Sequence, residues 1–268
     1  MTDGLLRAPW TIVRTLLEII YGLYVVTVFL VFGLSAFVAV LLPFGIKTRR
    51  HIAHFAGRAF FAVAGLRLRV IDEHLLPVGP CVVVANHASY LDGIVLKAAL
   101  PARFSFVIKK EFSRVPVAGL LLRRIGSEFV DRFNRHGGGM DVRRLLKAAD
   151  AGQALAFFPE GTFLAEPGLG KFHSGAFTIA ARVDLPVVPL AIKGTRQILP
   201  SGRFLPRPGR IDIHVLPLIG PMSDMKHSEA AAHTRDLAHA RILAELGEPD
   251  LSSNDGIAAL QSKRTLDT

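Results

Sequence analysis

The residues with the clearest chemical potential lie where the apolar run at 82–85 ends in Asn86 and His87, with Asp92 five positions beyond the histidine. The pattern places His87 at the exposed end of a buried strand and Asp92 on the first turn of the next helix. A carboxylate placed there accepts a hydrogen bond from one ring nitrogen and leaves the other free to take a proton. No Gly-x-Ser-x-Gly elbow is present. The pair predicts a general base for a substrate hydroxyl; a histidine that only caps a strand is the alternative.

Two further segments carry polar residues at expected strand ends. A short strand leads to Arg132, and an arginine can bind phosphate through two hydrogen bonds. A second, buried strand runs into the turn Pro159–Thr162. There Glu160 can bind a substrate hydroxyl or orient the basic groups, Gly161 permits close backbone approach and Thr162 is a donor. Taken alone, an exposed surface arginine is the better explanation of the first segment, and an ordinary strand-to-loop turn is the alternative for the second.

The remaining pattern predicts the sheet that must position these residues. Strands separated by helices of this length favour a mixed, mainly parallel α/β sheet that is covered by helices on both faces. Reactive groups then lie beyond the carboxyl ends of the strands. We expect strands at 67–72, 81–85, 105–108, 128–130, 154–158, 187–192 and 211–219, helices at 91–100, 115–125, 142–149, 175–182 and 228–246, and a flexible glycine turn at 137–139. The strand at 187–192 is bracketed by prolines and can line a site for an acyl chain.

An apolar N-terminal region sets this chain apart from an ordinary soluble α/β protein. Residues 19–46 contain no charged side chain over 28 positions, and about 20 apolar residues suffice to cross a bilayer. Two geometries are open: a single span, or a re-entrant helix pair broken near Gly33 and Ser35 or at Pro43. We expect a membrane anchor at 1–50, an α/β domain at 51–247 and a disordered tail at 248–268.

The net charge of +10 is confined to one part of the chain. Residues 47–150 contain 18 Lys and Arg against 8 Asp and Glu, whereas the flanking segments are balanced. Such a segment attracts anionic lipid headgroups or phosphorylated substrates, and no nucleic-acid-binding signature accompanies it. The richer basic cluster after the apolar run predicts that the α/β domain lies on the cytoplasmic side of an inner membrane. Cys81 is the single cysteine, so we expect no disulfide and a buried thiol.

Together, the order and spacing of these segments are far more specific than any one of them. The chain resembles the 1-acyl-glycerol-3-phosphate acyltransferase family over roughly residues 65–220. The family's His-x4-Asp block is matched by His87 and Asp92, and its Asp-Arg pair by Asp131 and Arg132. Its Phe-Pro-Glu-Gly-Thr block is matched by residues 158–162, and its Val-Pro strand by residues 187–190.

This resemblance implies transfer of a fatty acyl group from acyl-CoA or acyl carrier protein to the hydroxyl of a lysophospholipid. His87 would deprotonate that hydroxyl and Asp92 would hold the tautomer of the ring. Arg132, helped by Lys109, would bind the acceptor phosphate. No metal and no cofactor beyond the thioester co-substrate are implied. The residues expected to bind substrate are Asn86, Lys109, Arg132, Glu160, Gly161, Thr162 and Lys171.

One position departs from the family's pattern. The third block usually continues with Arg and Ser after its threonine, but Phe163 and Leu164 stand there. Either Arg132, Lys109 and Lys171 suffice for the phosphate, or the acceptor is a different lysolipid, such as a lyso-aminolipid. A lipid-binding protein without catalytic activity on the same fold is the alternative from a different class.

Overall fold

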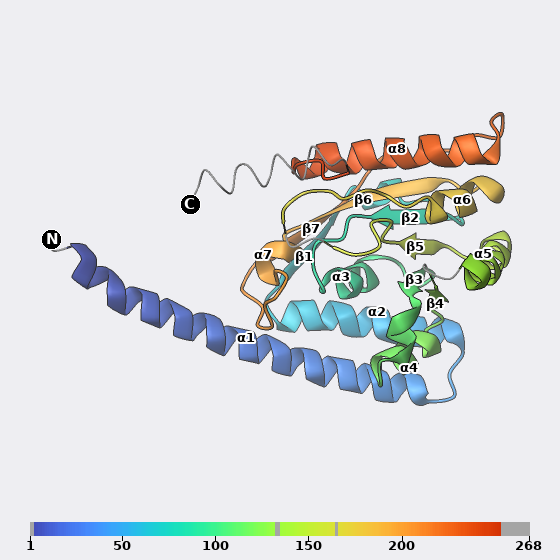
Figure 1. Ribbon diagram of the computed structural model, residues 1–268. Coiled ribbons are helices and arrows are strands. Elements are labelled where there is room, and N and C mark those ends of the chain that lie inside the picture. The colour runs from blue at the N-terminus through green and yellow to red at the C-terminus, as the bar shows by residue number, and fades with distance from the viewer. Residues whose placement is uncertain (1–2, 132–134, 164–165, 253–268) are drawn as a thin grey trace.

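In the computed structural model, which describes residues 3–131, 135–163 and 166–252, a seven-stranded sheet is enclosed between helices (Figure 1). The strand order is β1-β7-β6-β2-β5-β3-β4, and only the β6–β7 pairing is antiparallel. The expected mixed, mainly parallel sheet is therefore confirmed. The strands are β1 Arg67–Ile71, β2 Val82–Ala85, β3 Ser105–Lys109, β4 Glu128–Val130, β5 Leu155–Phe157, β6 Val187–Lys193 and β7 Arg210–Val215.

Helices cover both faces of this sheet. The helices are α1 Asp3–Leu41, α2 Ile46–Val63, α3 Asp92–Ala99, α4 Ala118–Arg124, α5 Arg135–Asp150, α6 Gly175–Arg182, α7 Thr195–Ile198 and α8 His227–Leu246, with short 3-10 turns η1 Glu73–Leu75 and η2 Lys110–Arg114. Figure 1 shows α2 and α3 on one side of the sheet and α6 and α8 on the other. Since both faces are covered, β2 is apolar and fully buried at every position, as expected of a central parallel strand.

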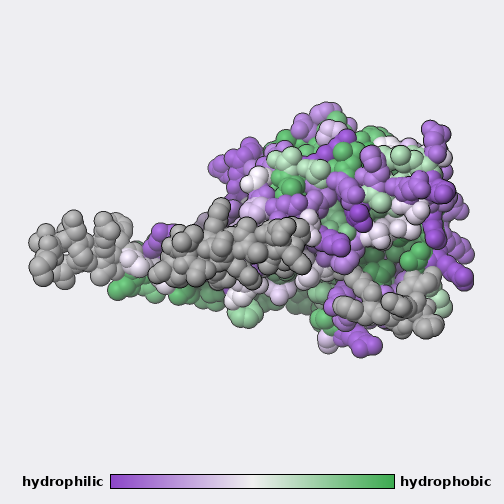
Figure 2. All heavy atoms as spheres, turned by 45° about the horizontal axis from the view of Figure 1, so that its top comes forward, coloured by the Kyte–Doolittle hydropathy of each residue, from purple (hydrophilic) through white to green (hydrophobic). Residues whose placement is uncertain are grey.

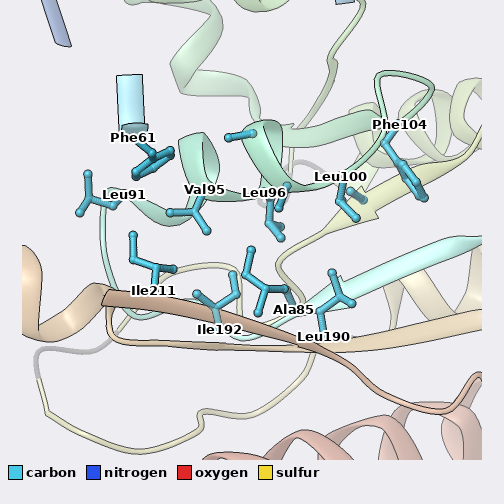
Figure 3. Packing of buried hydrophobic residues seen from close by; sticks show 14 of the residues in the cluster. Phe61, Ala85, Leu91, Val95, Leu96, Leu100, Phe104, Leu190, Ile192 and Ile211 are labelled. Carbon is cyan, nitrogen blue, oxygen red and sulfur yellow. The ribbon is translucent and has the colours of Figure 1, made fainter. Parts of the chain in front are cut away.

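The larger core lies between α3 and the sheet. Val95 and Leu96 point toward Ala85 and Ile192, Leu91 lies beside Val95, and Phe61 of α2 packs above them (Figure 3). The side chains of Val95 and Leu96 are fully buried. This packing fixes the start of α3 over the end of β2, which is where the site lies.

Helix α1 is one unbroken helix that runs alongside α2. It continues through Gly33 and Ser35, and the chain reverses only after Leu41, near Pro43. Its Tyr21 and Tyr24 hydroxyls donate to carbonyls at the end of α2 at 2.9 and 2.7 Å. The segment Thr11–Leu41 is the one stretch of the described residues that is long and apolar enough to cross a membrane, and 22% of its most apolar window is buried. One face of α1 therefore packs on the domain and the other is exposed.

Several expected bounds are wrong; the strand expected at 211–219, for example, ends at Val215. Gly137–Gly139 lie inside α5 rather than in a turn, since α5 runs from Arg135 to Asp150. Each glycine costs a helix about 1 kcal/mol, but burial of Leu145 and Ala149 against β3 and β5 outweighs that cost. Helix α4 begins at Ala118, not at residue 115, because the preceding residues form a tight turn.

The chain after α8 is still part of the domain for a few residues. Glu248 accepts a hydrogen bond from the Gly168 N–H at 2.7 Å, Asp250 pairs with Leu169, and Leu251 is buried. The remainder of the expected tail lies outside the described residues.

Candidate active site

The predicted base and its carboxylate are in contact. His87 Nδ1 lies 2.8 Å from Asp92 Oδ2, and Asp92 is completely buried. The same Oδ2 accepts the backbone N–H groups of Ala88 and Ser89 at 2.6 and 2.8 Å. Because Oδ2 acts as the acceptor in this cluster, the geometry assigns the proton of the His87 contact to Nδ1. Nε2 is then the nitrogen that can accept one, and no hydrogen bond reaches it from the part of the chain that the structure describes.

The five-residue spacing works because two elements meet there. His87 follows the last residue of β2, and Asp92 is the first residue of α3. Asn86 fixes the end of β2 by using both ends of its side-chain amide on the backbone of Ile192 in β6, at 3.0 and 2.7 Å. The Ser89 hydroxyl donates to the Leu199 carbonyl at 2.7 Å and holds the loop between His87 and α3. Asn86 is thus placed as a positioning residue, and its predicted contact with substrate remains a prediction.

Glu160 is brought to His87 by the neighbouring strand. Strand β5 pairs directly with β2, so the turn after β5 lies beside His87. Glu160 Oε1 accepts the His87 backbone N–H at 2.6 Å, and Oε2 accepts the Gly170 N–H at 2.9 Å. Burial raises the pKa of this carboxyl to about 7, although the two N–H donors oppose the rise. Glu160 therefore ties the base to the loop that ends at Gly170.

Aromatic rings frame the imidazole. Phe158 stacks on His87 with ring centroids 4.4 Å apart, and Phe163 meets it edge-on at 4.9 Å. The exposed ring of Tyr90 packs on Phe163 at 4.8 Å. Apart from Phe163, the sequence offered no signal for this group, because aromatic residues at strand ends are ordinarily core residues. The position where the family's pattern has arginine is therefore an apolar wall beside the base.

The other predicted residues are spread along the same edge of the sheet. Lys109 ends β3 and pairs with Glu111 at 3.4 Å, while Gly161 adopts a φ of +81° in the turn after β5. Thr162 is exposed, and Lys171 is exposed directly after Gly170. Arg132 lies outside the described residues, although Asp131 before it is held by the Asp141 carboxylate through its N–H at 2.8 Å. In the described residues, no group of three or more His, Cys, Asp or Glu could hold a metal ion.

Comparison with known proteins identifies the family of the chain. Residues 67–193 match the family model described as Acyltransferase. The 1-acyl-sn-glycerol-3-phosphate acyltransferase of Pseudomonas aeruginosa is 30% identical over 195 residues, which cover 70% of this chain and 72% of that protein. This chain belongs to the 1-acyl-sn-glycerol-3-phosphate acyltransferase family.

Two further proteins with related names are similar to this chain, one in sequence and one in structure. The chloroplastic enzyme BAT2 of Brassica napus is 32% identical over 217 residues, or 75% of this chain, but the chain spans only 62% of that protein. The crystal structure of the 1-acyl-sn-glycerophosphate acyltransferase PlsC from Thermotoga maritima superimposes with a TM-score of 0.67 at 22% identity. That match covers 86% of this chain and 95% of PlsC, and it shows the shared acyltransferase fold.

Proposed function

We propose that the chain transfers a fatty acyl group from a thioester, acyl-CoA or acyl carrier protein, to the free hydroxyl of 1-acyl-glycerol-3-phosphate, giving phosphatidic acid. The contact between His87 and the buried Asp92 is the observation that carries the proposal. His87 Nε2 takes the hydroxyl proton as the oxygen attacks the thioester carbonyl carbon. The carbon–sulfur bond then breaks, and the same proton passes to the departing thiolate. No acyl-enzyme and no metal ion enter this sequence of steps.

The decisive test is thiol release from acyl-CoA by the purified protein in detergent with lysophosphatidate. We expect His87→Ala to lose turnover while keeping the fold measured by circular dichroism. His227→Ala, an exposed histidine at the start of α8, is the control and should keep full activity. If the wild-type protein releases thiol no faster than His87→Ala, acyl transfer between these two substrates is excluded.

A second acceptor is favoured by one observation. Phe163 places a ring, not a cation, against His87 and Tyr90. A lysolipid with another headgroup is the competing acceptor, and the same assay with a panel of lysolipids ranks the candidates by kcat/KM. A non-catalytic lipid-binding protein would give no release with any member of the panel.

We further propose that α1 lies in the plane of the membrane instead of crossing it. An apolar helix of this length indicates association with a membrane. Glu18 of α1 pairs with Arg203 and Arg207 at 3.2 and 3.1 Å, far along the chain from the end of the helix. These contacts and those of Tyr21 and Tyr24 hold more than half of α1 against the domain. An in-plane helix at a cytoplasmic membrane face would keep the domain at the bilayer surface.

A further inference from the structure

An exposed apolar cluster follows β3 and extends from η2 into α4. Phe112, Val115, Val117 and Leu120 are exposed to 48%, 44%, 55% and 38%. We call these four residues the α4 tip. Single exposed apolar residues are ordinary, but a contiguous group on one short segment marks a surface that binds something.

The backbone of the tip is strained. Val117 has φ +62° and ψ −64°, and the Ala118 N–H bonds to the Pro116 carbonyl at 2.6 Å, which closes a three-residue γ-turn. A β-branched residue is a genuine outlier at positive φ, where Gly or Asn would fit better. Such conformations gather at functional positions, where the surroundings hold them. The strain presents an apolar side chain outward, so stability of the fold does not explain it.

Basic residues surround the tip. Between Lys109 and Arg124 the sequence has five Lys or Arg and one acidic residue, Glu111, which pairs with Lys109. Arg114 and Arg123 are exposed, and Arg123 also donates to the Ser113 carbonyl at 2.7 Å. Apolar side chains ringed by cations match the headgroup and upper acyl region of an anionic bilayer.

The tip is continuous with the exposed face of α1. The Arg124 guanidinium donates to the carbonyls of Val40, Leu41 and Leu42, at the end of α1, at 3.1, 2.7 and 3.3 Å. The turn there exposes further apolar side chains, Leu42 to 48% and Phe44 to 42%. In Figure 1, α4 reaches down to the level of α1, and Figure 2 shows apolar residues along the α1 side of the molecule.

We propose that the α4 tip is a second membrane contact, whose partner is a bilayer containing anionic lipids. Together with α1 it makes two points of attachment, which fix the orientation of the domain on the surface. The tip lies in the chain between Lys109 and Asp131, and β3 and β4 bring those two residues to the same edge of the sheet. If the proposed function holds, this contact keeps the acceptor edge of the site against the leaflet that holds a lysolipid.

The test uses an environment-sensitive fluorophore on a cysteine at Val117→Cys in the full chain. Cys81 does not compete for the label, because it is fully buried and burial raises the pKa of its thiol to about 11. Val78→Cys is the matched control, since Val78 is 95% exposed and lies outside the tip. Vesicles contain phosphatidylglycerol, phosphatidylethanolamine and a lipid with a nitroxide on its acyl chain.

We expect the probe at 117 to shift to shorter wavelength and lose most of its emission on these vesicles, while the probe at 78 does neither. Val115→Cys repeats the measurement if labelling at 117 disturbs the turn. Exchanging Arg114 and Arg123 for glutamine should reduce quenching on anionic vesicles. Equal quenching at 117 and 78 overturns the proposal. A shift that grows with protein concentration without vesicles also overturns it, because the occupant is then a second copy. This readout requires no catalysis, so it stands apart from the acylation assay.

Discussion

At the scale of single residues, the orientation of His87 is set before any substrate arrives. Asp92 holds Nδ1, Phe158 covers one face of the ring and Phe163 meets its edge. Glu160 holds the backbone N–H of the same residue. The ring therefore has one tautomer and one direction, so the proposed base would not have to be oriented anew in each turnover.

Asp92→Asn is the sharpest test of this arrangement. The amide oxygen can keep the three hydrogen bonds that Oδ2 accepts, but the variant loses the negative charge that stabilises His87 once its ring has taken the substrate proton. We expect kcat to fall about 10³- to 10⁴-fold, as in other histidine–carboxylate pairs, with little change in KM. Steady-state thiol release measures both constants. A loss confined to KM would contradict a role through the base.

The raised pKa of Glu160 predicts how the stability of the fold depends on pH. Its pKa is about 7 in the folded chain against 4.5 in a free side chain, so the folded state binds more protons between those two values. The contribution of Glu160 to the free energy of unfolding is therefore largest below pH 4.5 and decreases as the pH rises toward 7. Its full size is on the order of 3 kcal/mol as an upper bound. Denaturation at several pH values in detergent measures the slope.

Glu160→Gln supplies the comparison for that slope. Glutamine does not titrate, so the fall in stability between pH 4.5 and 7 should disappear. The glutamine amide has only one oxygen, so it can accept the N–H of His87 or that of Gly170, but not both. The buried N–H that loses its acceptor costs about 1 to 3 kcal/mol. An unchanged slope in the variant would assign the pH dependence to another group.

At the scale of elements, the sequence predicted best where one pattern dominates. Helix α6 has the expected bounds, and β2 differs by one residue, because a buried central strand is continuously apolar and α6 has a strong apolar face. The expected turn at Gly137–Gly139 was wrong because the helix propensity of glycine is a local property, whereas α5 is stabilised by packing on distant strands. The turn at Val117 was not predicted because valine rarely adopts a positive φ, so its presence in a sequence does not indicate such a turn.

Some contacts of the site could likewise be predicted from the sequence and others could not. His87 and Asp92 could be paired from sequence, because a strand end and a helix start five residues apart must be neighbours. The partners of Glu160 could not be predicted, since they depend on β5 lying next to β2 and on the loop folding back at Gly170. Strand order is a property of the whole sheet, and no local spacing encodes it.

Helix α3 also carries a half-buried charge, on Lys97, that can be removed. Burial, together with a smaller effect of the nearby Arg50 cation, lowers the pKa of Lys97 to about 8. Its ammonium lies 5.5 Å from the centre of the Phe106 ring. We expect Lys97→Met to raise the free energy of unfolding at pH 7 by about 1 kcal/mol, because an apolar side chain avoids the desolvation cost.

The pH profile distinguishes this cause from a change in packing. Unfolded Lys97 binds its proton up to about pH 10.5, while the folded side chain releases it near pH 8, so wild-type stability gains a contribution as pH rises between these values. The gain should vanish in Lys97→Met. Lys147→Met, an exposed lysine on α5, should leave both stability and slope unchanged. A stabilised Lys97→Met variant that keeps the wild-type slope would contradict the charge argument.

At the scale of the whole molecule, α1 is the proposed membrane contact and it also belongs to the fold. Val25 and Val28 are buried in the same core as α2, and the apolar residues on the opposite face are exposed. A helix that crossed the bilayer alone would not need that buried face. The packing of α1 on the domain therefore contributes to the free energy of unfolding, and a helix that spans the bilayer alone would not make this contribution.

Two glycines of α1 test this directly. A Cβ at Gly22 would lie 2.7 Å from Leu205 Cβ, whereas at Gly33 nothing lies within 4 Å. Gly22→Leu and Gly33→Leu make α1 equally more apolar, but only the first forces α1 away from the loop around Leu205. In vesicles, Gly22→Leu should lower the free energy of unfolding by about 1 to 3 kcal/mol through overpacking. Gly33→Leu should be neutral or stabilise by about 1 kcal/mol through helix propensity. Equal behaviour of the two variants would mean that α1 leaves the domain in the membrane, as a single span requires.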